Sequence, residues 1–339
     1  MKKKLLLMGL VAMLCLSLAL TGCGNGTPAE PDGDEDEYKV ALVLSGPSND
    51  GGWNATGFRG ATEAQAMHGF HLSVSENVDQ SDIEDVYRGY AMDGYDMVIG
   101  HGFQFGDASL LIGPDYPDTY FLVTSSLAHV QEPNVGSAQP NYPQSGFMVG
   151  YVAGHMTESK VVGAISGVDM PPVRAQSDYF LVGAKYFDEN IRTLRVFTGS
   201  FDDVGAVKET ATAMIDDGAD VILANANQAS AGGAIAAQEA GVYYIGINAD
   251  QHNLAPGTVV TSSVQHWVVI FEHLTGLGMS GELTAGAYEV GIAEGAIELA
   301  PFREFEDVIP DDVKADIMDM YEKLKNHEVV PTDYAHLLD

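Results

Sequence analysis

Residues 39–60 read KVALVLSGPSNDGGWNATGFRG, and this stretch decides the fold of the chain. The apolar run Val40–Leu44 has the length of a buried parallel strand. Turn-forming residues follow at 45–52, and a helical pattern begins just after Trp53. Open α/β sheets bind ligands where a strand end, a glycine-rich loop and a helix start meet. We therefore expect this stretch to present backbone N–H groups and the flat Trp53 side chain to a small molecule.

The N-terminal segment indicates export. Three lysines precede the apolar run Leu5–Leu20, and Leu-Thr-Gly-Cys then ends at Cys23, which is the layout of a secretory signal. The small residues before a single cysteine resemble the lipobox of bacterial lipoproteins, in which Cys23 would be acylated; an uncleaved anchor and an ordinary signal are the alternatives. We expect a lipoprotein signal at 1–23, a disordered tether at 24–37, and a lipid-anchored domain on the extracytoplasmic face of the cell membrane.

Composition argues against several classes of function. The formal net charge is −32, and removal of the three N-terminal lysines makes it −35; such a surface repels nucleic acid, so no nucleic-acid partner is expected. The two cysteines are Cys15 and Cys23, which leaves the mature domain without a disulfide or a thiol nucleophile. The ten histidines lack metal-ligand spacing, and no nucleophile elbow or phosphate-binding loop is present. We predict no metal, no cofactor and no enzymatic activity.

Apolar runs alternate with amphipathic segments along the rest of the chain, and this spacing predicts parallel sheets with right-handed crossovers. Strands are expected at 40–44, 71–75, 97–100, 120–124, 135–139, 161–165, 195–198, 221–224, 243–247, 259–262 and 288–291. Helices are expected at 55–67, 81–93, 105–115, 145–157, 174–190, 203–217, 231–240, 265–277 and 311–325. Ser81 and Asp203 are the expected N-caps, and a short strand or hairpin is expected at 293–299.

The order of these elements predicts an α/β fold of two doubly wound parallel-sheet lobes joined by a hinge. The first strands form one sheet, and a second βα series follows. An apolar helix and a short strand remain after residue 265, so the chain crosses back to the first lobe. We expect an N-terminal lobe of 38–140 plus about 265–292, and a C-terminal lobe of 141–264 plus about 293–339.

Seven blocks then occur in a characteristic order: 50–54 (DGGWN), 96–103 (DMVIGHGF), 116–121 (YPDTYF), 147–160, 197–203 (FTGSFDD), 217–222 (DGADVI) and 245–251 (IGINADQ). Together they resemble the basic membrane protein family, the substrate-binding lipoproteins of ABC importers best known for purine nucleosides. Each block is weak alone, whereas their shared order is specific. The resemblance implies a fold like that of type I periplasmic binding proteins, a small molecule held between the lobes, and a membrane permease as partner.

An aromatic side chain of the family's first block stacks on the base of the ligand, and the resemblance implies this role for Trp53. Its polar neighbours Asn49, Asp50 and Asn54 would then read the base or the ribose. The alternative is a tryptophan that packs in the core or between lobes. The chain has two tryptophans, and the position of Trp53 after two glycines favours the ligand-binding role over packing.

Two residues depart from the family pattern. Asn248 stands where many members have Asp, and Gln265 stands where they have Lys. The resemblance implies that those charged residues hold ribose hydroxyls, so their replacement favours a free base or a nucleoside held differently. Neutral amides can pair with the edges of a base, and burying them costs less than burying an unpaired charge. A second family aromatic falls on Gln176.

Further candidates follow strand ends. Phe103 and Gln104 should face the cleft, as should Asn225, Asn227 and Gln228, although loop packing and turn chemistry explain each equally well. The remaining candidates, for which a structural role is the alternative, are Ser125, Ser126, Met170, Arg174 and Asp250.

The sequence therefore predicts a lipid-anchored substrate-binding component of an ABC importer, which captures a purine nucleoside or nucleobase between two lobes. A second interpretation is a lipid-anchored sensor that presents a bound small molecule to a membrane receptor. A third, an exported nucleoside hydrolase, would need a carboxylate cluster with a metal or a nucleophile, and the sequence gives no sign of either.

Overall fold

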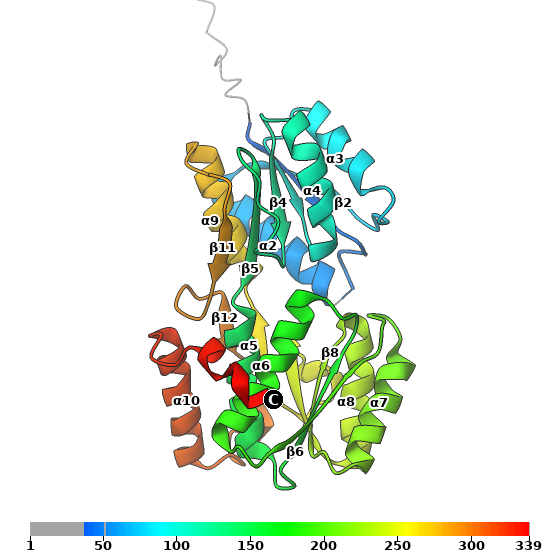
Figure 1. Cartoon of the computed structure of the whole chain (residues 1–339), viewed down its shortest axis with the longest axis vertical. Coiled ribbons are helices and arrows are strands. Elements are labelled where there is room, and N and C mark those ends of the chain that lie inside the picture. The colour runs from blue at the N-terminus through cyan, green and yellow to red at the C-terminus, as the bar shows by residue number, and fades with distance from the viewer. Residues whose placement is uncertain (1–36, 51, 339) are drawn as a thin grey trace, which may run out of the picture. The chain divides into compact units, whose positions relative to one another are not determined.

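Two six-stranded sheets organise the chain from Tyr38 onward (Figure 1). The computed structural model describes residues 37–50 and 52–338, so the predictions for the signal, for Cys23 and for most of the tether lie outside the described residues. The strand order is β11-β5-β4-β3-β1-β2 in the first sheet and β12-β10-β9-β8-β6-β7 in the second. All neighbours pair in parallel except β10 and β12. The predicted α/β class with two doubly wound parallel sheets is confirmed.

The first sheet and its helices are called the N-lobe below, and the second sheet and its helices the C-lobe. The N-lobe strands are β1 (Lys39–Val43), β2 (His71–Ser75), β3 (Met97–Gly100), β4 (Tyr120–Thr124), β5 (Val135–Pro140) and β11 (Ala287–Val290). The C-lobe strands are β6 (Val161–Ser166), β7 (Arg192–Phe197), β8 (Val221–Asn225), β9 (Tyr243–Asn248), β10 (Val259–Gln265) and β12 (Ile297–Leu299). The helices are α2 (Trp53–His68), α3 (Ile83–Met92), α4 (Gly106–Ile112), α5 (Tyr142–Met156), α6 (Pro171–Phe187), α7 (Val204–Asp216), α8 (Ser230–Ala240), α9 (Trp267–Ser280) and α10 (Asp311–Lys325).

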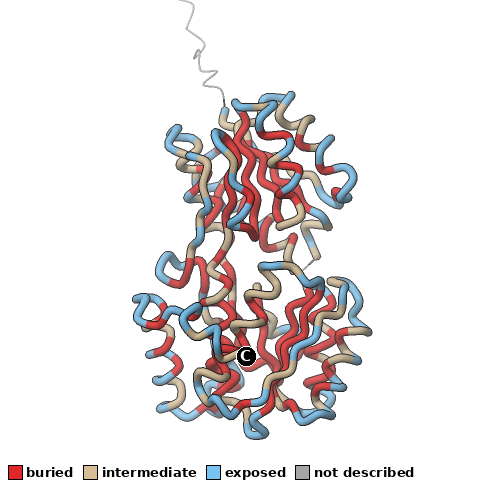
Figure 2. Tube along the Cα trace, viewed as in Figure 1, coloured by how far each residue is buried: buried red, intermediate tan, exposed pale blue. Residues whose placement is uncertain are grey.

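Each sheet is buried on both faces, which explains why its strands read as continuous apolar runs. In β1, Val40 and Leu42 pack in the cluster that includes residues of α2 and α9, whereas Ala41 and Val43 pack in the cluster that includes residues of α3 and α4. Successive side chains of a strand point to opposite faces, so this alternation is the one expected. Figure 2 shows the resulting buried strands between more exposed helices.

The C-lobe repeats this arrangement. Val162 and Ala164 of β6 pack in the cluster that contains residues of α5, α6 and α10, and Val161 and Ile165 pack in the cluster that contains residues of α7 and α8. The chain passes between the sheets three times, from β5 to α5, from β10 to α9 and from β11 to β12. The lobes are thus built from interleaved segments.

Some predicted boundaries were wrong. Strand β7 begins at Arg192 rather than at 195, because it is an edge strand whose partly exposed residues form no apolar run. Helices α5 and α6 begin earlier than expected, at Tyr142 and Pro171, since proline fits the first turn of a helix, where its missing N–H is not needed. The helix expected at 105–115 is shorter, and 3₁₀ turns flank α4 on both sides.

Of the two predicted N-caps, one is confirmed and one is wrong. Oδ1 of Asp203 accepts a hydrogen bond from the backbone N–H of Ala206 at 2.9 Å, as an N-cap side chain does. Helix α3 instead starts after Asp82, whose side chain makes no capping hydrogen bond. The Ser81 hydroxyl donates to the Asp82 carboxylate at 3.0 Å, so it is not available to the helix.

Candidate ligand-binding site

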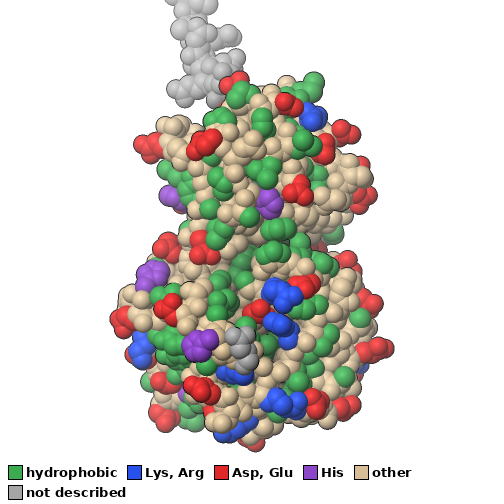
Figure 3. All heavy atoms as spheres, in the orientation of Figure 1, with side chains coloured by type: hydrophobic (Ala, Val, Ile, Leu, Met, Phe, Trp, Pro, Cys, Tyr) green, Lys and Arg blue, Asp and Glu red, His purple; other side chains and the backbone are tan. Residues whose placement is uncertain are grey.

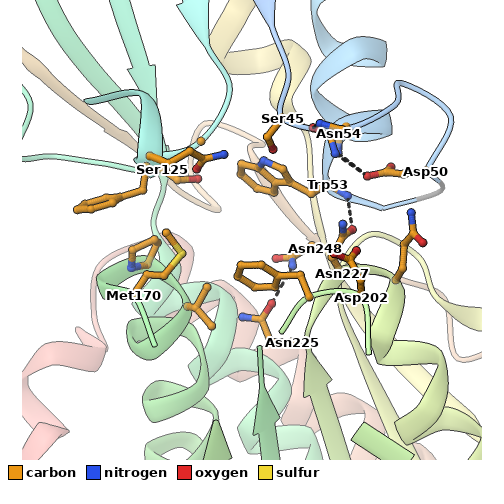
Figure 4. A pocket seen from close by; sticks show the side chains of 18 of the residues that line it. Ser45, Asp50, Trp53, Asn54, Ser125, Met170, Asp202, Asn225, Asn227 and Asn248 are labelled. Atoms are coloured by element: carbon orange, nitrogen blue, oxygen red, sulfur yellow. Dashed lines mark hydrogen bonds between the residues drawn. The ribbon is translucent and has the colours of Figure 1, made fainter. Parts of the chain in front are cut away.

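A cavity of about 370 Å³ lies at the carboxyl ends of strands from both sheets. The strand order of each sheet reverses beside its first strand in the chain, between β1 and β3 in the N-lobe and between β6 and β8 in the C-lobe. Loops diverge at such a switch point and leave room for a ligand. The volume falls in the usual range for small-molecule sites, about 300–1,000 Å³. Figure 4 shows labelled side chains from both lobes around this space.

Trp53 is the first residue of α2 and lies between the core and the cavity. Its ring stacks on the imidazole of His101, with centroids 4.2 Å apart and 10° between the planes. The ring of Trp267 lies nearly perpendicular to the ring of Trp53, with centroids 5.3 Å apart. Nε1 of Trp53 donates to the backbone carbonyl of His101 at 3.2 Å. One face of Trp53 and its N–H are thus used by the protein, while the opposite face borders the cavity (Figure 4).

His101 is fully buried behind Trp53. Its Nε2 donates to the Trp53 carbonyl at 3.2 Å, so Nδ1 accepts from the Thr124 hydroxyl, also at 3.2 Å. Burial lowers the pKa of His101 to about 3, so the ring is neutral at pH 7. A Cβ on Gly57 would lie 2.4 Å from the imidazole, and only glycine fits there. The sequence analysis missed His101, whose sole signal is its place directly after β3.

Asp50 organises the start of α2. Its carboxylate accepts from the backbone N–H groups of Gly52, Asn54 and Ala55 at 2.8–3.0 Å, and from the side-chain amide of Asn54 at 2.8 Å. Burial alone raises the pKa of Asp50, but these hydrogen bonds outweigh it and hold the pKa below its usual value. Oδ1 of Asn54 in turn accepts from the N–H of Gly46 at 3.3 Å. Both predicted ligand contacts line the cavity, and both also hold the loop together.

Three amide side chains form a closed hydrogen-bonded ring on the C-lobe side. Gln176 Nε2 donates to Asn248 Oδ1 at 2.9 Å, Asn248 Nδ2 donates to Asn225 Oδ1 at 3.1 Å, and Asn225 Nδ2 donates to Gln176 Oε1 at 2.8 Å. All three line the cavity. Asn248 has a φ of 69°, a left-handed conformation that asparagine tolerates.

Gln265 lies behind this amide ring and does not line the cavity. Its Nε2 donates to Asn248 Oδ1 at 2.8 Å, while its Oε1 is buried without a hydrogen-bond partner in the described part of the chain. The expected direct contact between Gln265 and a ligand is therefore corrected, because Asn248 stands in between. The two residues that depart from the family pattern are bonded to each other.

Asn227 connects the two lobes across the cleft. Its Oδ1 accepts from the backbone N–H of Trp53 at 2.8 Å (Figure 4). A Cβ on Gly52 would lie 2.0 Å from this oxygen, so the contact requires glycine at that position. The predicted ligand contact Asn227 thus also has a partner in the protein. Asn49 lies outside the 370 Å³ cavity and lines an adjoining space of about 600 Å³, which Asn227 and Trp53 also border.

The structure divides the other candidates. Those that line the 370 Å³ cavity are Phe103, Gln104, Ser125, Met170 and Gln228. Ser126 and Arg174 do not line it, and Arg174 donates through Nε to Asp169 at 3.0 Å. Asp250 borders the adjoining space, where its carboxylate accepts from Arg303 at 3.0 Å. The lining also includes residues that the sequence analysis missed, among them Ser45, Asn77, Tyr142, Phe201 and Asp202.

Charged groups are scarce around the cavity. Of the described residues that line it, only Asp50 and Asp202 carry a formal charge, and both are negative. In residues 37–50 and 52–338, no three side chains of His, Cys, Asp or Glu are grouped so that they could hold a metal ion. No helix within those ranges has the length and apolar character needed to cross a membrane.

Two parallel α/β lobes with a cavity between them are the fold of type I periplasmic binding proteins. Solved structures of solute-binding proteins share this fold. A solute-binding protein of an ABC transporter system from Aeropyrum pernix has a TM-score of 0.77 and 20% identity, covering 86% of this chain and 92% of that one. The counterpart from Conexibacter woesei has a TM-score of 0.70 and 26% identity, covering 86% and 98%. A transcriptional activator of the comK gene from Bacillus halodurans has a TM-score of 0.75 and 22% identity, covering 86% and 99%.

The chain belongs to the Bmp family, described as ABC transporter substrate-binding protein PnrA-like, whose model matches residues 37–333. It is 28% identical to the transcriptional activator protein med of Bacillus subtilis, over 86% of this chain and 90% of the relative. It is 24% identical to a purine-binding protein of Brucella abortus, over 88% and 83%. The predicted family and the prediction of a binding protein rather than an enzyme are both confirmed.

Proposed function

We propose that the protein is the lipid-anchored substrate-binding component of an ABC importer and captures a purine nucleoside or nucleobase in the 370 Å³ cavity. The observation that carries the proposal is the free face of Trp53, which is backed by neutral His101 at 4.2 Å and held at its edge by Trp267. A flat ring in a fixed orientation matches a flat heterocycle. Stacking of a base on an aromatic side chain contributes about 1–3 kcal/mol.

The amide ring supports recognition of the edge of a base. Asn225 and Asn248 each use one of their two Nδ2 hydrogens within the ring, which leaves one N–H on each beside the cavity. Purines carry ring nitrogens and exocyclic oxygens that accept such hydrogen bonds. The relative named as a purine-binding protein in Brucella abortus supports the same ligand class.

The membrane attachment follows from the lipobox-like segment that ends at Cys23. Acylation of Cys23 would tether the domain outside the membrane, beside the permease that receives the ligand. Incorporation of a labelled fatty acid into the wild-type protein, and its loss in Cys23→Ser, is the expected result. Label retained in Cys23→Ser would refute this site of anchoring.

Calorimetric titration of the purified protein against purine bases, purine nucleosides, pyrimidine nucleosides and free sugars tests the ligand class. We expect the purine compounds to bind most tightly. Trp53→Leu should weaken binding at least about 10-fold because the stacking surface is lost, whereas Trp53→Phe, which keeps an aromatic face, should stay within about threefold of wild type.

Circular dichroism melts of both variants confirm that any loss of affinity is not a loss of folding. If no purine compound binds, the ligand class is wrong. If Trp53→Leu binds as tightly as Trp53→Phe, the stacking role is wrong while the ligand class stands.

A second function, a lipid-anchored sensor that presents its ligand to a membrane receptor, is favoured by one observation. Two similar proteins, from Bacillus subtilis and Bacillus halodurans, are named as transcriptional activators. Genes for a permease and an ATPase beside the gene for this protein, together with loss of ligand uptake on deletion, support the importer. Unchanged uptake with an altered transcriptional response supports the sensor.

A further inference from the structure

The direction of the hydrogen bonds in the amide ring decides what the ring can offer to a ligand. A side-chain amide has two hydrogens on its nitrogen and two lone pairs on its oxygen, so the groups left over depend on the partners it already has. Gln176 and Asn225 are buried, whereas Asn248 is only half-buried. Asn225 and Asn248 both lie beside the cavity (Figure 4). The group that Asn248 turns toward the cavity is therefore the most accessible one of the ring.

The oxygen of Asn248 is fully used within the protein. Oδ1 accepts from Gln176 Nε2 at 2.9 Å and from Gln265 Nε2 at 2.8 Å. These two bonds occupy both lone pairs, so Asn248 can only donate to a ligand, through the second hydrogen of Nδ2. The Nδ2 of Asn225, which lies next to Asn248 in the ring, also keeps one hydrogen. The C-lobe side of the cavity thus presents two neighbouring N–H donors.

Gln265 fixes this direction from behind the ring. Its side chain is 1% exposed, and its Oε1 has no hydrogen-bond partner among the described residues. If the ring ran the other way, Asn248 would donate to Oε1, and the Nε2 group with its two hydrogens would take the place of the unpartnered oxygen. Buried N–H groups without an acceptor are rarer than buried carbonyl oxygens without a donor. Gln265 therefore acts on a ligand through Asn248 and does not touch it.

We infer that Gln265 is a positioning residue that holds the amide ring in its donating direction, and that the cavity thereby prefers 6-oxopurines to 6-aminopurines. The two neighbouring donors match O6 and N7 of a 6-oxopurine, which are both acceptors, whereas in adenine N7 stands beside the donor N6. An N–H of the ring that faces N6 would be left unpaired. Resting on the proposed function, the inference adds a choice between purines that stacking on Trp53 cannot make, since all purines have a similar flat face.

Calorimetric titration with inosine, adenosine and the nucleoside of unsubstituted purine tests this preference. We expect inosine to bind at least about 10-fold more tightly than adenosine. The unsubstituted nucleoside should fall between them, because it keeps N7 and has no group at C6. In Gln265→Met the ring is free to reverse, so inosine and adenosine should bind within about threefold of each other.

Gln144→Met is the matched control. Gln144 is also a buried glutamine, its Oε1 accepts from the N–H of Ile292 at 3.0 Å, and it lines neither cavity. Its replacement should lower stability and leave the ratio of the adenosine and inosine dissociation constants unchanged. In Asn248→Asp the carboxylate has no hydrogen to donate, and aspartate tolerates the φ of 69°. This variant should bind adenosine more tightly than inosine.

Inosine and adenosine bound within threefold by the wild-type protein would overturn the preference and leave purine recognition intact. An unchanged ratio in folded Gln265→Met would overturn the role of Gln265, and an unchanged ratio in Asn248→Asp would overturn that of Asn248. If no purine binds, the proposed function has failed. Neutron diffraction of ligand-free crystals then decides the ring direction, because it locates the amide hydrogens whether or not a ligand binds or a variant folds. Nδ2 of Asn248 bonded to Gln265 would overturn the inference.

Discussion

The N-lobe and C-lobe sides of the cavity use different chemistry. On the N-lobe side, Trp53 stacks on His101. The polar side chains next to Trp53, those of Asp50 and Asn54, already accept hydrogen bonds from the backbone of the loop and the start of α2. On the C-lobe side, amides bond to one another in a ring and keep spare N–H groups. The N-lobe thus supplies a rigid surface, and the C-lobe supplies hydrogen-bonding groups.

The two sides also differ in what keeps them in place. The aromatic side depends on packing, since His101 and Trp267 are almost fully buried and fix the ring of Trp53 from one face and one edge. The amide ring depends on every member, because a buried polar group that loses its partner costs about 1–3 kcal/mol. Other acidic side chains are spread over both lobes on the face shown in Figure 3.

The largest effect is expected from removing the amide that the others share. Asn248→Ala leaves Gln176, Gln265 and Asn225 each short of one hydrogen bond. Water entering from the cavity will satisfy part of this loss, so we expect the free energy of unfolding to fall by about 3 kcal/mol. Urea unfolding followed by circular dichroism measures the change.

Asn248→Gly is the matched control, because it removes the same hydrogen bonds but accommodates the φ of 69° without strain. Its loss should be about 1 kcal/mol smaller than that of Asn248→Ala. A change below 0.5 kcal/mol in both variants would show that the ring does not stabilise the C-lobe.

The next effect concerns the aromatic side and depends on pH. The pKa of His101 in the folded protein, about 3, lies below the ordinary histidine pKa of about 6.5. Between these values the unfolded chain binds a proton that the folded chain does not, so stability falls as the pH is lowered through this window. From pH 7 to pH 5 the loss from His101 is about 2 kcal/mol. The side chains of the amide ring do not titrate, so we expect no contribution from them to the pH dependence of stability.

Burial also lowers the pKa values of His129 and His155, so a reference variant is required to isolate the effect of His101. His101→Phe retains an aromatic ring and removes the titration. The drop in unfolding free energy between pH 7 and pH 5 should be about 2 kcal/mol smaller in this variant than in wild type. Equal drops would mean that His101 is protonated in the folded protein.

The fold could be predicted from the sequence because local signals agree with it. Strands β2, β3 and β4 have the predicted bounds, since turn-forming residues frame each apolar run. The start of strand β7 was predicted too late. Its edge position leaves its side chains partly exposed, so the strand lacks the apolar run on which the prediction depends.

The candidate site could be predicted in part. Trp53, Gln176 and Asn248 were chosen by sequence, and they line one cavity. The contacts that Trp53 makes within the protein could not be found in this way. His101 lies 48 positions from Trp53, and Asn227 lies 174 positions from it, so no local pattern encodes either contact. The role of Asp50 as acceptor for the loop likewise depends on backbone geometry rather than on residue type.

A smaller effect is expected where the two sides touch. Asn227→Ala removes the hydrogen bond to the Trp53 N–H, and one such bond contributes about 1 kcal/mol. The ligand-free protein should open more often, and the affinity for the ligand should fall about fivefold. Distances between spin labels on the two lobes measure the opening. Gln228→Ala is the control, because Gln228 lines the same cavity without a side-chain bond to the N-lobe among the described residues. Equal distance distributions in both variants would exclude a linking role for Asn227.

The smallest effect compares the helix starts of the two lobes, away from the cavity. Asp203→Ala removes the side-chain oxygen that accepts from Ala206 at the start of α7, and loss of such a cap costs about 1 kcal/mol. Ser81→Ala, before α3 in the N-lobe, should change stability by less than about 0.5 kcal/mol, because Ser81 bonds to Asp82 and not to the helix backbone. Chemical unfolding measures both changes, and ligand affinity should be unaffected in each. A larger loss for Ser81→Ala than for Asp203→Ala would reverse the assignment of the caps.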